Sequence, residues 1–244
     1  MRLRMTVAYD GTQFSGWQSQ AHGKAVQDAL ESAFRLLCGA RIVVHGSGRT
    51  DAGVHAEGQS AHADVPDGRL PIGEWLPALN ANIPPGVRVM SLRKAAPDFH
   101  ARFSARAKVY RYTIWNGPVM PPLLINRAWH VPGKLDPGLL RSACECLTGR
   151  HDFAAFCARR AKAGESTIRA VSVIRPGRKG PALALTFEGD GFLYKMVRML
   201  AASVIRCAAG RLPLDEIRRL LKNAGPRTSY VAPAGGLCLV RVLY

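Results

Sequence analysis

The chain has 244 residues, and 48% of them are hydrophobic, which suits one large or two smaller globular domains and excludes a disordered chain. Lysines and arginines number 34 against 17 aspartates and glutamates, so the formal net charge is +17. A chain this basic is expected to bind a polyanion, most often a nucleic acid, although a basic composition can also serve solubility alone.

In the first half of the chain, the hydrophobic pattern predicts strands around a helix. Residues 3–9 alternate between apolar and polar side chains like a strand, and Asp10-Gly11-Thr12 turns the chain. Apolar residues recur at helical spacing over residues 26–37, and Gly39 ends that helix. The remaining expectations are a short strand at 41–45, extended structure at 59–63, a helix at 72–79 that Pro77 ends or kinks, and a strand at 87–93.

In the second half, β-branched and aromatic residues at 109–115 predict a strong strand. Asp136 and Pro137 are typical of a helix N-cap and a first helical position, and this helix is expected to run to about residue 147. The other predicted elements are a hairpin with strands at 171–175 and 183–187, the longest helix at 191–209, a short helix at 215–222 and a strand at 237–243.

Each half therefore contains strands, a helix of three or more turns and further strands. This order predicts an α+β fold with antiparallel sheet. A division near residue 105 is expected, with an N-terminal half at residues 1–105 and a C-terminal half at residues 106–244.

The cysteines and the apolar segments indicate a reduced protein without a metal and without a membrane partner. None of the six cysteines forms a Cys-x-x-Cys pair, so the spacing of a zinc site is absent, and a chain of this size needs no disulfide framework. Residues 191–209 come nearest to a membrane span, but three basic residues interrupt them. Residues 1–6 lack the apolar block of a signal peptide. We therefore expect a cytoplasmic location.

The most informative segment is residues 46–56, which read Gly-Ser-Gly-Arg-Thr-Asp-Ala-Gly-Val-His-Ala. Asp51 stands between glycines, which let the backbone approach a ligand closely. An aspartate with a pKa of about 3.9 is ionised at neutral pH and can attack an electrophile without a general base. Arg49 is expected to keep this carboxylate charged and oriented. The pattern favours covalent chemistry at an electrophilic carbon. By itself, however, an aspartate in a glycine-rich loop is more often a turn residue.

Basic residues are interleaved with aromatic residues where the second half begins. The segment 102–112 carries four basic residues together with Tyr110 and Tyr112, which suits phosphate contact combined with base stacking. The basic run of Arg159, Arg160 and Lys162 is interpreted as a solvated surface loop instead.

The motif at 48–56 and five further segments occur in one order along nearly the whole chain. These segments are Tyr-Asp-Gly-Thr-Gln-Phe-Ser-Gly-Trp-Gln at 9–18, a helix start at Val26 and Gln27, Asn-Ala-Asn-Ile-Pro at 80–84, Phe-His-Ala-Arg-Phe-Ser-Ala at 99–105 followed by Tyr-Arg-Tyr at 110–112, and Gly-Phe-Leu-Tyr-Lys-Met-Val-Arg at 191–198. Together they resemble the family of tRNA pseudouridine synthases that act on positions 38–40 of the anticodon stem-loop.

The resemblance implies a role for each matched residue. Asp51 corresponds to the catalytic aspartate, Tyr110 to the tyrosine that lies against the flipped base, and Arg198 to the basic residue that pairs with the aspartate. Arg49 corresponds to the motif arginine, which helps to open the stem-loop and to place the target. An RNA-binding stretch corresponds to Phe99, His100, Ala101, Arg102 and Phe103.

The resemblance also implies the architecture and the partners. It implies two similar α/β halves that form a continuous, mainly antiparallel sheet flanked by helices, with a basic central cleft. The C-terminal half would complete the active-site cleft around the aspartate of the N-terminal half. The family works as homodimers in which one tRNA reaches both subunits, and it needs no cofactor. Two segments depart from its pattern, namely Met199-Leu200 after the arginine and the loop at 158–167.

The implied reaction breaks the bond between uridine N1 and C1′ and joins C1′ to C5. Asp51 would either attack C1′ or assist the loss of uracil by taking a proton from C2′, and both routes remain open. We interpret His55 and His100 as structural hydrogen-bonding residues rather than as acid–base groups.

Two other functions are possible from the residues alone. A non-catalytic RNA-binding module explains the charge but gives no reason for a carboxylate in the Asp51 turn. A base-excising hydrolase usually needs a second carboxylate, for which Glu57 is the nearest candidate in sequence.

Overall fold

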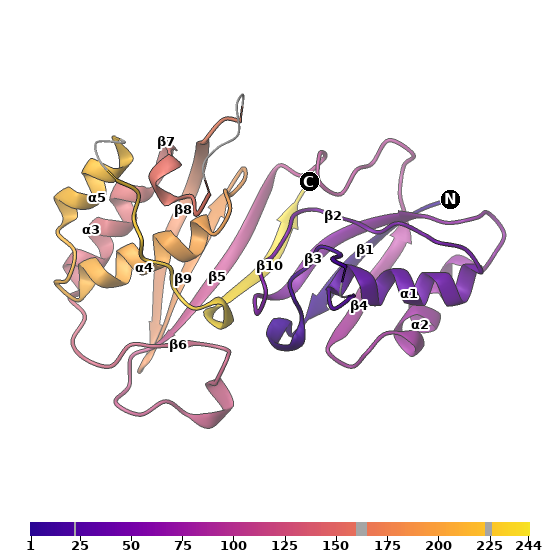
Figure 1. Cartoon of the computed structure of the whole chain (residues 1–244), viewed down its shortest axis with the longest axis horizontal. Coiled ribbons are helices and arrows are strands. Elements are labelled where there is room, and N and C mark those ends of the chain that lie inside the picture. The colour runs from indigo at the N-terminus through magenta and orange to yellow at the C-terminus, as the bar shows by residue number, and fades with distance from the viewer. Residues whose placement is uncertain (22, 160–164, 223–225) are drawn as a thin grey trace. The chain divides into compact units, whose positions relative to one another are not determined.

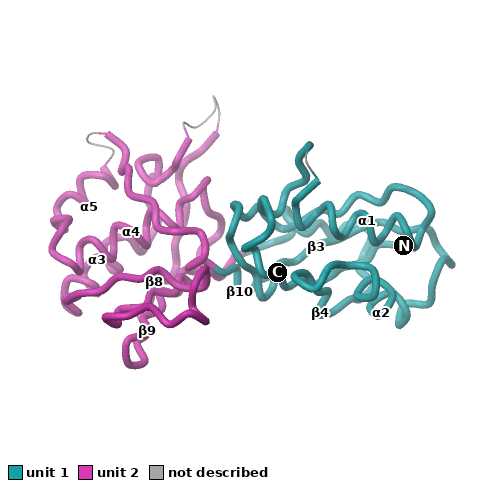
Figure 2. Tube along the Cα trace, turned by 60° about the horizontal axis from the view of Figure 1, so that its bottom comes forward, with its two compact units in different colours: residues 1–106, 238–244 teal, residues 107–237 magenta. Residues whose placement is uncertain are grey.

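The computed structural model describes residues 1–21, 23–159, 165–222 and 226–244 (Figure 1). It separates the chain into two compact units, which Figure 2 colours differently: residues 1–106 with 238–244, and residues 107–237. Each unit combines helices with mainly antiparallel strands, which confirms the predicted α+β class. The division falls beside the expected boundary near residue 105, and it assigns residues 238–244 to the first unit. The functional assignment of the two halves stays a prediction.

The sheet of the first unit is built around the predicted N-terminal strand. Its strands, in spatial order, are β4 (Val87–Lys94), β1 (Arg2–Tyr9), β3 (His55–Asp64) and β10 (Leu237–Leu243), with β2 (His45–Gly46) paired to β3. β1 runs antiparallel to β3 and β4, whereas β10 pairs in parallel with β3. The alternation expected in β1 is confirmed, because Leu3, Met5, Val7 and Tyr9 are all buried.

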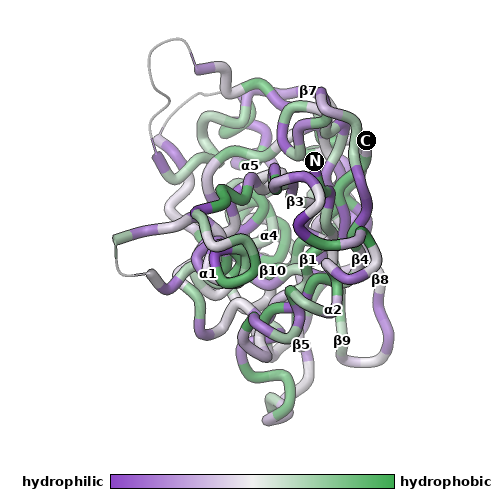
Figure 3. The backbone as a smooth tube through the Cα atoms, turned by 90° about the vertical axis from the view of Figure 1, so that its right-hand side faces the viewer, coloured by the Kyte–Doolittle hydropathy of each residue, from purple (hydrophilic) through white to green (hydrophobic). Residues whose placement is uncertain are grey.

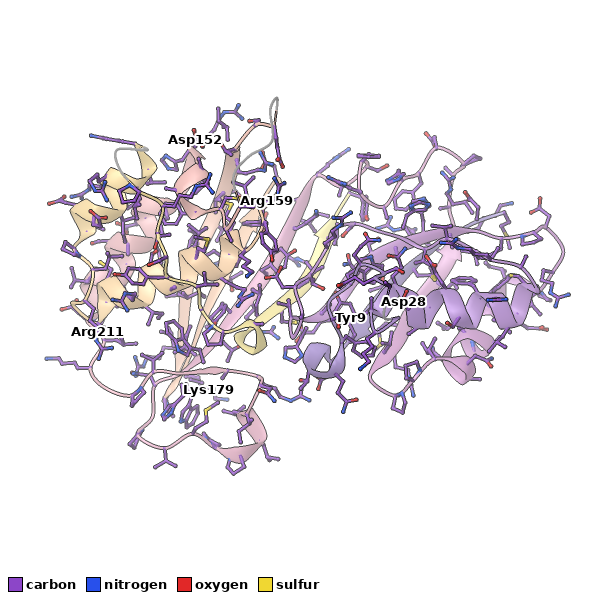
Figure 4. The ribbon with its side chains drawn as sticks, in the orientation of Figure 1. Tyr9, Asp28, Asp152, Arg159, Lys179 and Arg211 are labelled. Atoms are coloured by element: carbon purple, nitrogen blue, oxygen red, sulfur yellow. The ribbon has the colours of Figure 1, made fainter. Side chains whose placement is uncertain are left out.

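The described residues of this unit form two α-helices, and local signals in the sequence explain both ends of α1. α1 (Val26–Cys38) begins where the Asp28 carboxylate accepts the backbone N–H of Ala25, and it ends at Gly39, whose φ of 71° suits glycine. Figure 4 labels Asp28 in this first turn. α2 (Ile72–Asn82) continues beyond Pro77, so the expected end at residue 79 was wrong. Buried Trp75 packs on Phe34 of α1, and this packing outweighs the hydrogen bond that the proline removes.

The short strand expected at 41–45 was also largely wrong. Only His45 of that segment belongs to β2, and residues 41–44 have no regular structure. The backbone N–H of Val44 donates to the carboxylate of Glu31 at 3.1 Å, so a side chain of α1 replaces a strand partner at this point.

Within its described residues, the second unit contains five strands and three α-helices. The strands, in spatial order, are β5 (Ala107–Trp115), β9 (Ala182–Gly189), β8 (Ile168–Lys179) and β7 (Gly149–Asp152), all antiparallel, with the short β6 (Trp129–His130) paired to β5. The helices are α3 (Pro137–Leu147), α4 (Met196–Ala208) and α5 (Leu214–Leu221). Four short 3₁₀ helices complete the described elements of the chain, at Gly11–Gln13, Pro122–Leu124, Ala154–Phe156 and Ala234–Gly236.

The helix α4 begins later than the hydrophobic pattern suggests. It starts at Met196 rather than at residue 191, because Lys195 has a left-handed φ of 59°, and at 13 residues it equals α1 in length rather than exceeding it. Nearly every residue of α4 is buried, which Figure 3 reflects in its hydrophobic colouring. No helix within the described ranges combines the length and the apolarity that crossing a membrane requires.

The N-cap of α3 is the fold feature that the sequence predicts most sharply. The Asp136 carboxylate accepts the backbone N–H groups of Gly138 and Leu139 at 2.7 and 2.9 Å. Replacing it by alanine should lower the free energy of unfolding by about 1 kcal/mol, whereas Asp136→Asn, which keeps an acceptor oxygen, should lose much less. Urea unfolding followed by circular dichroism measures both, and an equal loss in the two variants would contradict the capping role.

Candidate functional site

Asp51 lies in the tight turn that leads from β2 to β3. Its carbonyl oxygen accepts the N–H of Val54 at 3.1 Å, and Gly53 within the turn has a φ of 77° that other residues rarely adopt. Asp51 itself is half-buried, while Val54 and His55 after it are buried. The turn therefore fixes the backbone of the aspartate and still leaves the residue partly accessible.

The first turn of the chain, residues 10–18 after β1, holds the Asp51 turn in place. Thr50 O accepts the N–H of Trp17 at 3.1 Å, and the N–H of Gly53 donates to Phe14 O at 3.4 Å. The Thr50 hydroxyl also lies 2.9 Å from the hydroxyl of Tyr9, which Figure 4 labels at the end of β1. These contacts join the two turns on both sides of Asp51.

Two glycines allow the turns to come this close. A Cβ atom on Gly11 would lie 2.1 Å from Val54 O, and one on Gly16 would lie 2.4 Å from Thr50 O. Gly16 also has a φ of 91°. Since both obstructing atoms are backbone, no side-chain movement relieves the contact. The glycines of the first turn are therefore part of the machinery that positions Asp51.

His55, which follows the Asp51 turn, forms a further contact with the turn after β1. Its Nδ1 accepts the backbone N–H of Gly11 at 3.1 Å and lies 3.2 Å from Asp10 Oδ1. Asp10 Oδ1 in turn accepts the N–H and the hydroxyl of Thr12. The geometry supports the structural role expected for this histidine.

Arg49 is exposed two residues before Asp51. Its Nε donates to Gln18 Oε1 at 3.1 Å, so a neutral amide from the first turn holds the guanidinium. Gln18 is tied to buried Gln27 of α1 through a hydrogen bond of 2.7 Å. The sequence motifs contain both glutamines, but their linkage to Arg49 depends on tertiary contacts and was missed.

The other two predicted catalytic residues belong to the second unit. Tyr110 lies on β5, is 8% exposed and meets the ring of Phe192 edge-on at 5.3 Å. Arg198 lies in the first turn of α4, where its Nε donates to Ala232 O at 2.8 Å. Burial raises the pKa of the neighbouring Tyr112, and the positive charge of Arg198 offsets only part of this rise. Asp51 and Arg49 are thus described within one unit, and Tyr110 and Arg198 within the other.

The predicted RNA-binding stretch at 99–103 is anchored to the first unit by its backbone. The N–H of Ala101 donates to His62 Nδ1 at 3.1 Å, and Ala101 O accepts the hydroxyl of Tyr244 at 2.7 Å. Arg2 donates to Phe99 O at 2.9 Å, and the Arg4 guanidinium lies over the ring of Tyr244 at 3.9 Å. Side chains from β1 and β3 and from residue 244 therefore set the shape of this stretch.

The same stretch presents aromatic and basic side chains outward. Phe103 is 77% exposed, with the His100 ring 4.3 Å and the Arg102 guanidinium 5.6 Å from its ring. His100 Nδ1 accepts the N–H groups of Arg102 and Phe103, which is a structural role for that ring. An exposed ring beside a guanidinium suits stacking on a nucleic-acid base and contact with a phosphate.

His62 joins His45 and His100 in a cluster that the sequence analysis did not detect. The His62 ring lies 4.9 Å from that of His45 and 4.6 Å from that of His100. Burial and these neighbours lower the pKa of His62 to about 4. The sequence alone gives no signal for this cluster, because the pairing of His45 with His62 depends on strand register.

Of the predicted basic loop, Arg160 and Lys162 lie outside the described residues. Arg159 forms an ion pair with Glu165 at 2.6 Å, and Figure 4 labels it near the edge of the second unit.

Because the two turns lie so close together, Gly16→Ala should lower the free energy of unfolding by a large amount. A left-handed backbone costs about 1–2 kcal/mol for an alanine, and overpacking against Thr50 O adds about 1–3 kcal/mol. Gly39→Ala is the matched control, because its φ of 71° is also positive but nothing lies within 4 Å of the added Cβ. Urea unfolding should show the larger loss for Gly16→Ala, and equal losses would contradict the tight approach.

The buried His62 predicts a pH dependence of stability. Because its pKa in the folded protein is about 4 and its usual value is about 6.5, the unfolded chain takes up the proton first. The free energy of unfolding should therefore fall as the pH drops from about 6.5 to about 4. His62→Asn keeps an acceptor for Ala101 and does not titrate, so urea unfolding should show a smaller fall. Identical pH profiles would contradict this assignment.

Comparison with known proteins identifies the family. The profile of the tRNA pseudouridine synthase family matches residues 5–104 and 143–244. The tRNA pseudouridine synthase A of Akkermansia muciniphila is 42% identical over 251 residues, which cover 100% of this chain and 95% of that protein. The enzyme of the same name from Solidesulfovibrio magneticus is 44% identical over 254 residues, covering 100% and 91%, and that from Rhodopseudomonas palustris is 40% identical over 253 residues, covering 100% and 99%.

These matches confirm the resemblance carried by the motifs and the fold class inferred from the pattern of elements. The family profile covers the Asp51 turn and the stretch at 99–103, and the relatives match the whole chain. The chain is therefore a member of the tRNA pseudouridine synthase family and an isomerase.

Proposed function

We propose that this enzyme converts uridine to pseudouridine at positions 38, 39 and/or 40 of the tRNA anticodon stem-loop, with Asp51 as the essential catalytic residue. The observation that carries the proposal is the half-buried Asp51 on a backbone fixed by Thr50, Gly53 and the glycines opposite. A reactive group held in advance of binding loses little freedom when the substrate arrives.

The proposed reaction is an isomerisation in which atoms and electrons balance within the nucleotide. The bond between N1 and C1′ breaks, the base turns over while bound, and C5 bonds to C1′. The hydrogen on C5 leaves as a proton, and N1 gains one. On one route, Asp51 attacks C1′ as the bond to N1 breaks, and the resulting ester bond breaks when C5 bonds to C1′. On the other route, Asp51 removes a proton from C2′ as the base leaves, and the proton returns to C2′ when C5 bonds to C1′. Because neither route oxidises or reduces the nucleotide overall, we propose that no cofactor is needed.

We propose that Tyr110 and Arg198 complete the site around Asp51. A tyrosine ring can stack on the extruded uracil and help to remove the C5 proton. A guanidinium can keep the aspartate ionised and stabilise negative charge that develops on uracil. The anchoring of Arg198 to Ala232 O and the packing of Tyr110 on Phe192 support these roles, because both side chains are held in defined positions.

Binding of the anticodon stem-loop is proposed to involve residues 99–103 and Arg49. Exposed Phe103 and Arg102 supply stacking and phosphate contact, and the net charge of +17 attracts the RNA. Extruding a base costs a few kcal/mol, which backbone contacts can offset. Binding should therefore weaken steeply as the salt concentration rises.

The assembly and location follow from the resemblance to the family. We propose a homodimer in which one tRNA reaches both copies, working in the cytoplasm.

The direct test is release of tritium from tRNA transcripts labelled at C5 of uridine. The unaltered enzyme should release tritium, and Asp51→Asn and Asp51→Ala should lower the rate by a factor on the order of 10⁴. Asp215→Asn is the matched control, because that carboxylate is 87% exposed on α5, and its rate should be unchanged.

The other outcomes discriminate between functions. Equal release by the Asp51 variants would exclude the proposed role of this aspartate. Binding of RNA without any release would favour a non-catalytic RNA-binding module. Free uracil among the products would favour a base-excising hydrolase, with Glu57 as the second carboxylate to examine.

A further inference from the structure

Four polar side chains form a continuous chain of hydrogen bonds that ends at Arg49. Gln27 lies in the first turn of α1 and is only 7% exposed, so its amide is a costly group to bury unless it is fully bonded. Its Nε2 donates to Glu31 Oε1 at 2.7 Å, and its Oε1 accepts Gln18 Nε2 at 2.7 Å. Gln18 Oε1 then accepts Arg49 Nε at 3.1 Å.

The two ends of this chain fix its direction. A carboxylate only accepts hydrogen bonds and a guanidinium only donates them, whereas each amide has one donating and one accepting side. With Glu31 at one end, Gln27 must turn its nitrogen toward Glu31 and its oxygen toward Gln18. Gln18 must then turn its oxygen toward Arg49. The orientation that receives the arginine is therefore set from inside the first unit.

Backbone groups lock the same orientation. Gln27 Oε1 also accepts the backbone N–H of Ser19 at 2.9 Å, and Glu31 Oε1 accepts the N–H of Val44 at 3.1 Å. A flipped amide at Gln27 would place its nitrogen against the donors of Ser19 and Gln18, and its oxygen against the Glu31 carboxylate. Such a flip would leave the buried amide of Gln27 without matching partners, and a buried polar group without a partner is costly.

We infer that Gln27 is a positioning residue that orients the Arg49 guanidinium beside Asp51 for contact with the RNA, acting through Gln18. This inference rests on the proposed function only in taking Arg49 to contact the RNA. Gln27 touches neither the RNA nor the reacting atoms. Its effect is to reduce the rotamer freedom of an otherwise exposed arginine before the substrate binds.

The chain of hydrogen bonds from Glu31 to Arg49 can be broken by one variant and restored by a second, matched variant. Gln27→Glu puts a carboxylate against Glu31 and breaks the chain at its centre. The double variant Gln27→Glu, Glu31→Gln restores it: the carboxylate at 27 accepts from Gln18, from Ser19 N–H and from the new amide at 31, whose oxygen accepts Val44 N–H. Gln27→Met and Gln18→Met remove the polar link with little change in volume and serve if the carboxylate variant fails to fold.

The first readout is independent of activity. In a ¹⁵N spectrum of the whole protein, the Nε–H signal of Arg49, assigned with Arg49→Lys, should exchange slowly with water in the unaltered enzyme and in the double variant. It should exchange fast in Gln27→Glu, Gln27→Met and Gln18→Met. Slow exchange retained in all the single variants would overturn the inference.

The second readout is binding of an anticodon stem-loop RNA, measured by fluorescence anisotropy. Gln27→Met should weaken binding about three- to tenfold, as expected for one hydrogen bond that orders a binding group. In an Arg49→Ala background the same substitution should have no further effect, because it acts through the arginine. The same loss in both backgrounds would show a merely structural role and overturn the inference.

These outcomes are separable from the proposed function. If no variant, nor the unaltered enzyme, releases tritium from labelled tRNA while the coupling between Gln27 and Arg49 persists, the proposed function fails and the positioning role stands. If tritium release is intact but the coupling is absent, the positioning role fails alone.

Discussion

The close approach of one backbone turn to another is the constraint on which the proposed catalytic region depends. The turn after β1 lies against the turn before β3 so closely that Gly11 and Gly16 have no room for a Cβ atom. Hydrogen bonds from Trp17 and Gly53 join the two turns, and Thr50 adds a buried contact with Tyr9. These contacts fix the backbone of Asp51, while the residue itself stays half-buried and therefore partly accessible.

The same turn links the aspartate to the interior of its unit. Trp17 O accepts the N–H of Gln27, so the first turn is continuous with the start of α1. Through Gln27 and Gln18, α1 also reaches Arg49. The aspartate and the motif arginine thus take their positions from one small set of contacts, and a change in that set is expected to affect both.

The stretch at 99–103 follows a similar principle at a different place in the first unit. Its backbone is held by His62, Arg2 and Tyr244, which leaves the side chains of Arg102 and Phe103 exposed. Because His62 accepts a hydrogen bond from Ala101 through Nδ1, this anchor requires a neutral ring, and burial supplies that condition by lowering the pKa of His62. Rigid support beneath exposed aromatic and basic groups is a general requirement for a binding surface.

Local signals in the sequence were sufficient for much of the fold. Alternation located β1, and the Asp136-Pro137 pair located the start of α3. Where a tertiary contact overrides local pattern, the prediction was wrong. Packing of Trp75 carries α2 past Pro77, the left-handed Lys195 delays α4, and Glu31 takes the N–H of Val44 that a longer strand would have paired.

The candidate site likewise has one part that the sequence predicts and another that depends on tertiary contacts. The Asp51 turn is readable because glycines, arginine and aspartate are adjacent in sequence. The glutamine chain to Arg49 and the histidine cluster are not readable, because they join residues from different elements. The same holds for the fold, because residues 238–244 belong to the first unit through tertiary contacts such as the pairing with β3 and the hydrogen bond from Tyr244 to Ala101 O.

The central claim, that the turn-held Asp51 isomerises uridine in the anticodon stem-loop, is tested most directly by mapping the product. Unmodified tRNA transcripts would be incubated with the enzyme and treated with a carbodiimide that marks pseudouridine, and the marked nucleotides would be located by reverse transcription. The account predicts marks at positions 38, 39 or 40 that are absent with Asp51→Asn. Marks confined to other positions, or marks that persist in the variant, would contradict it.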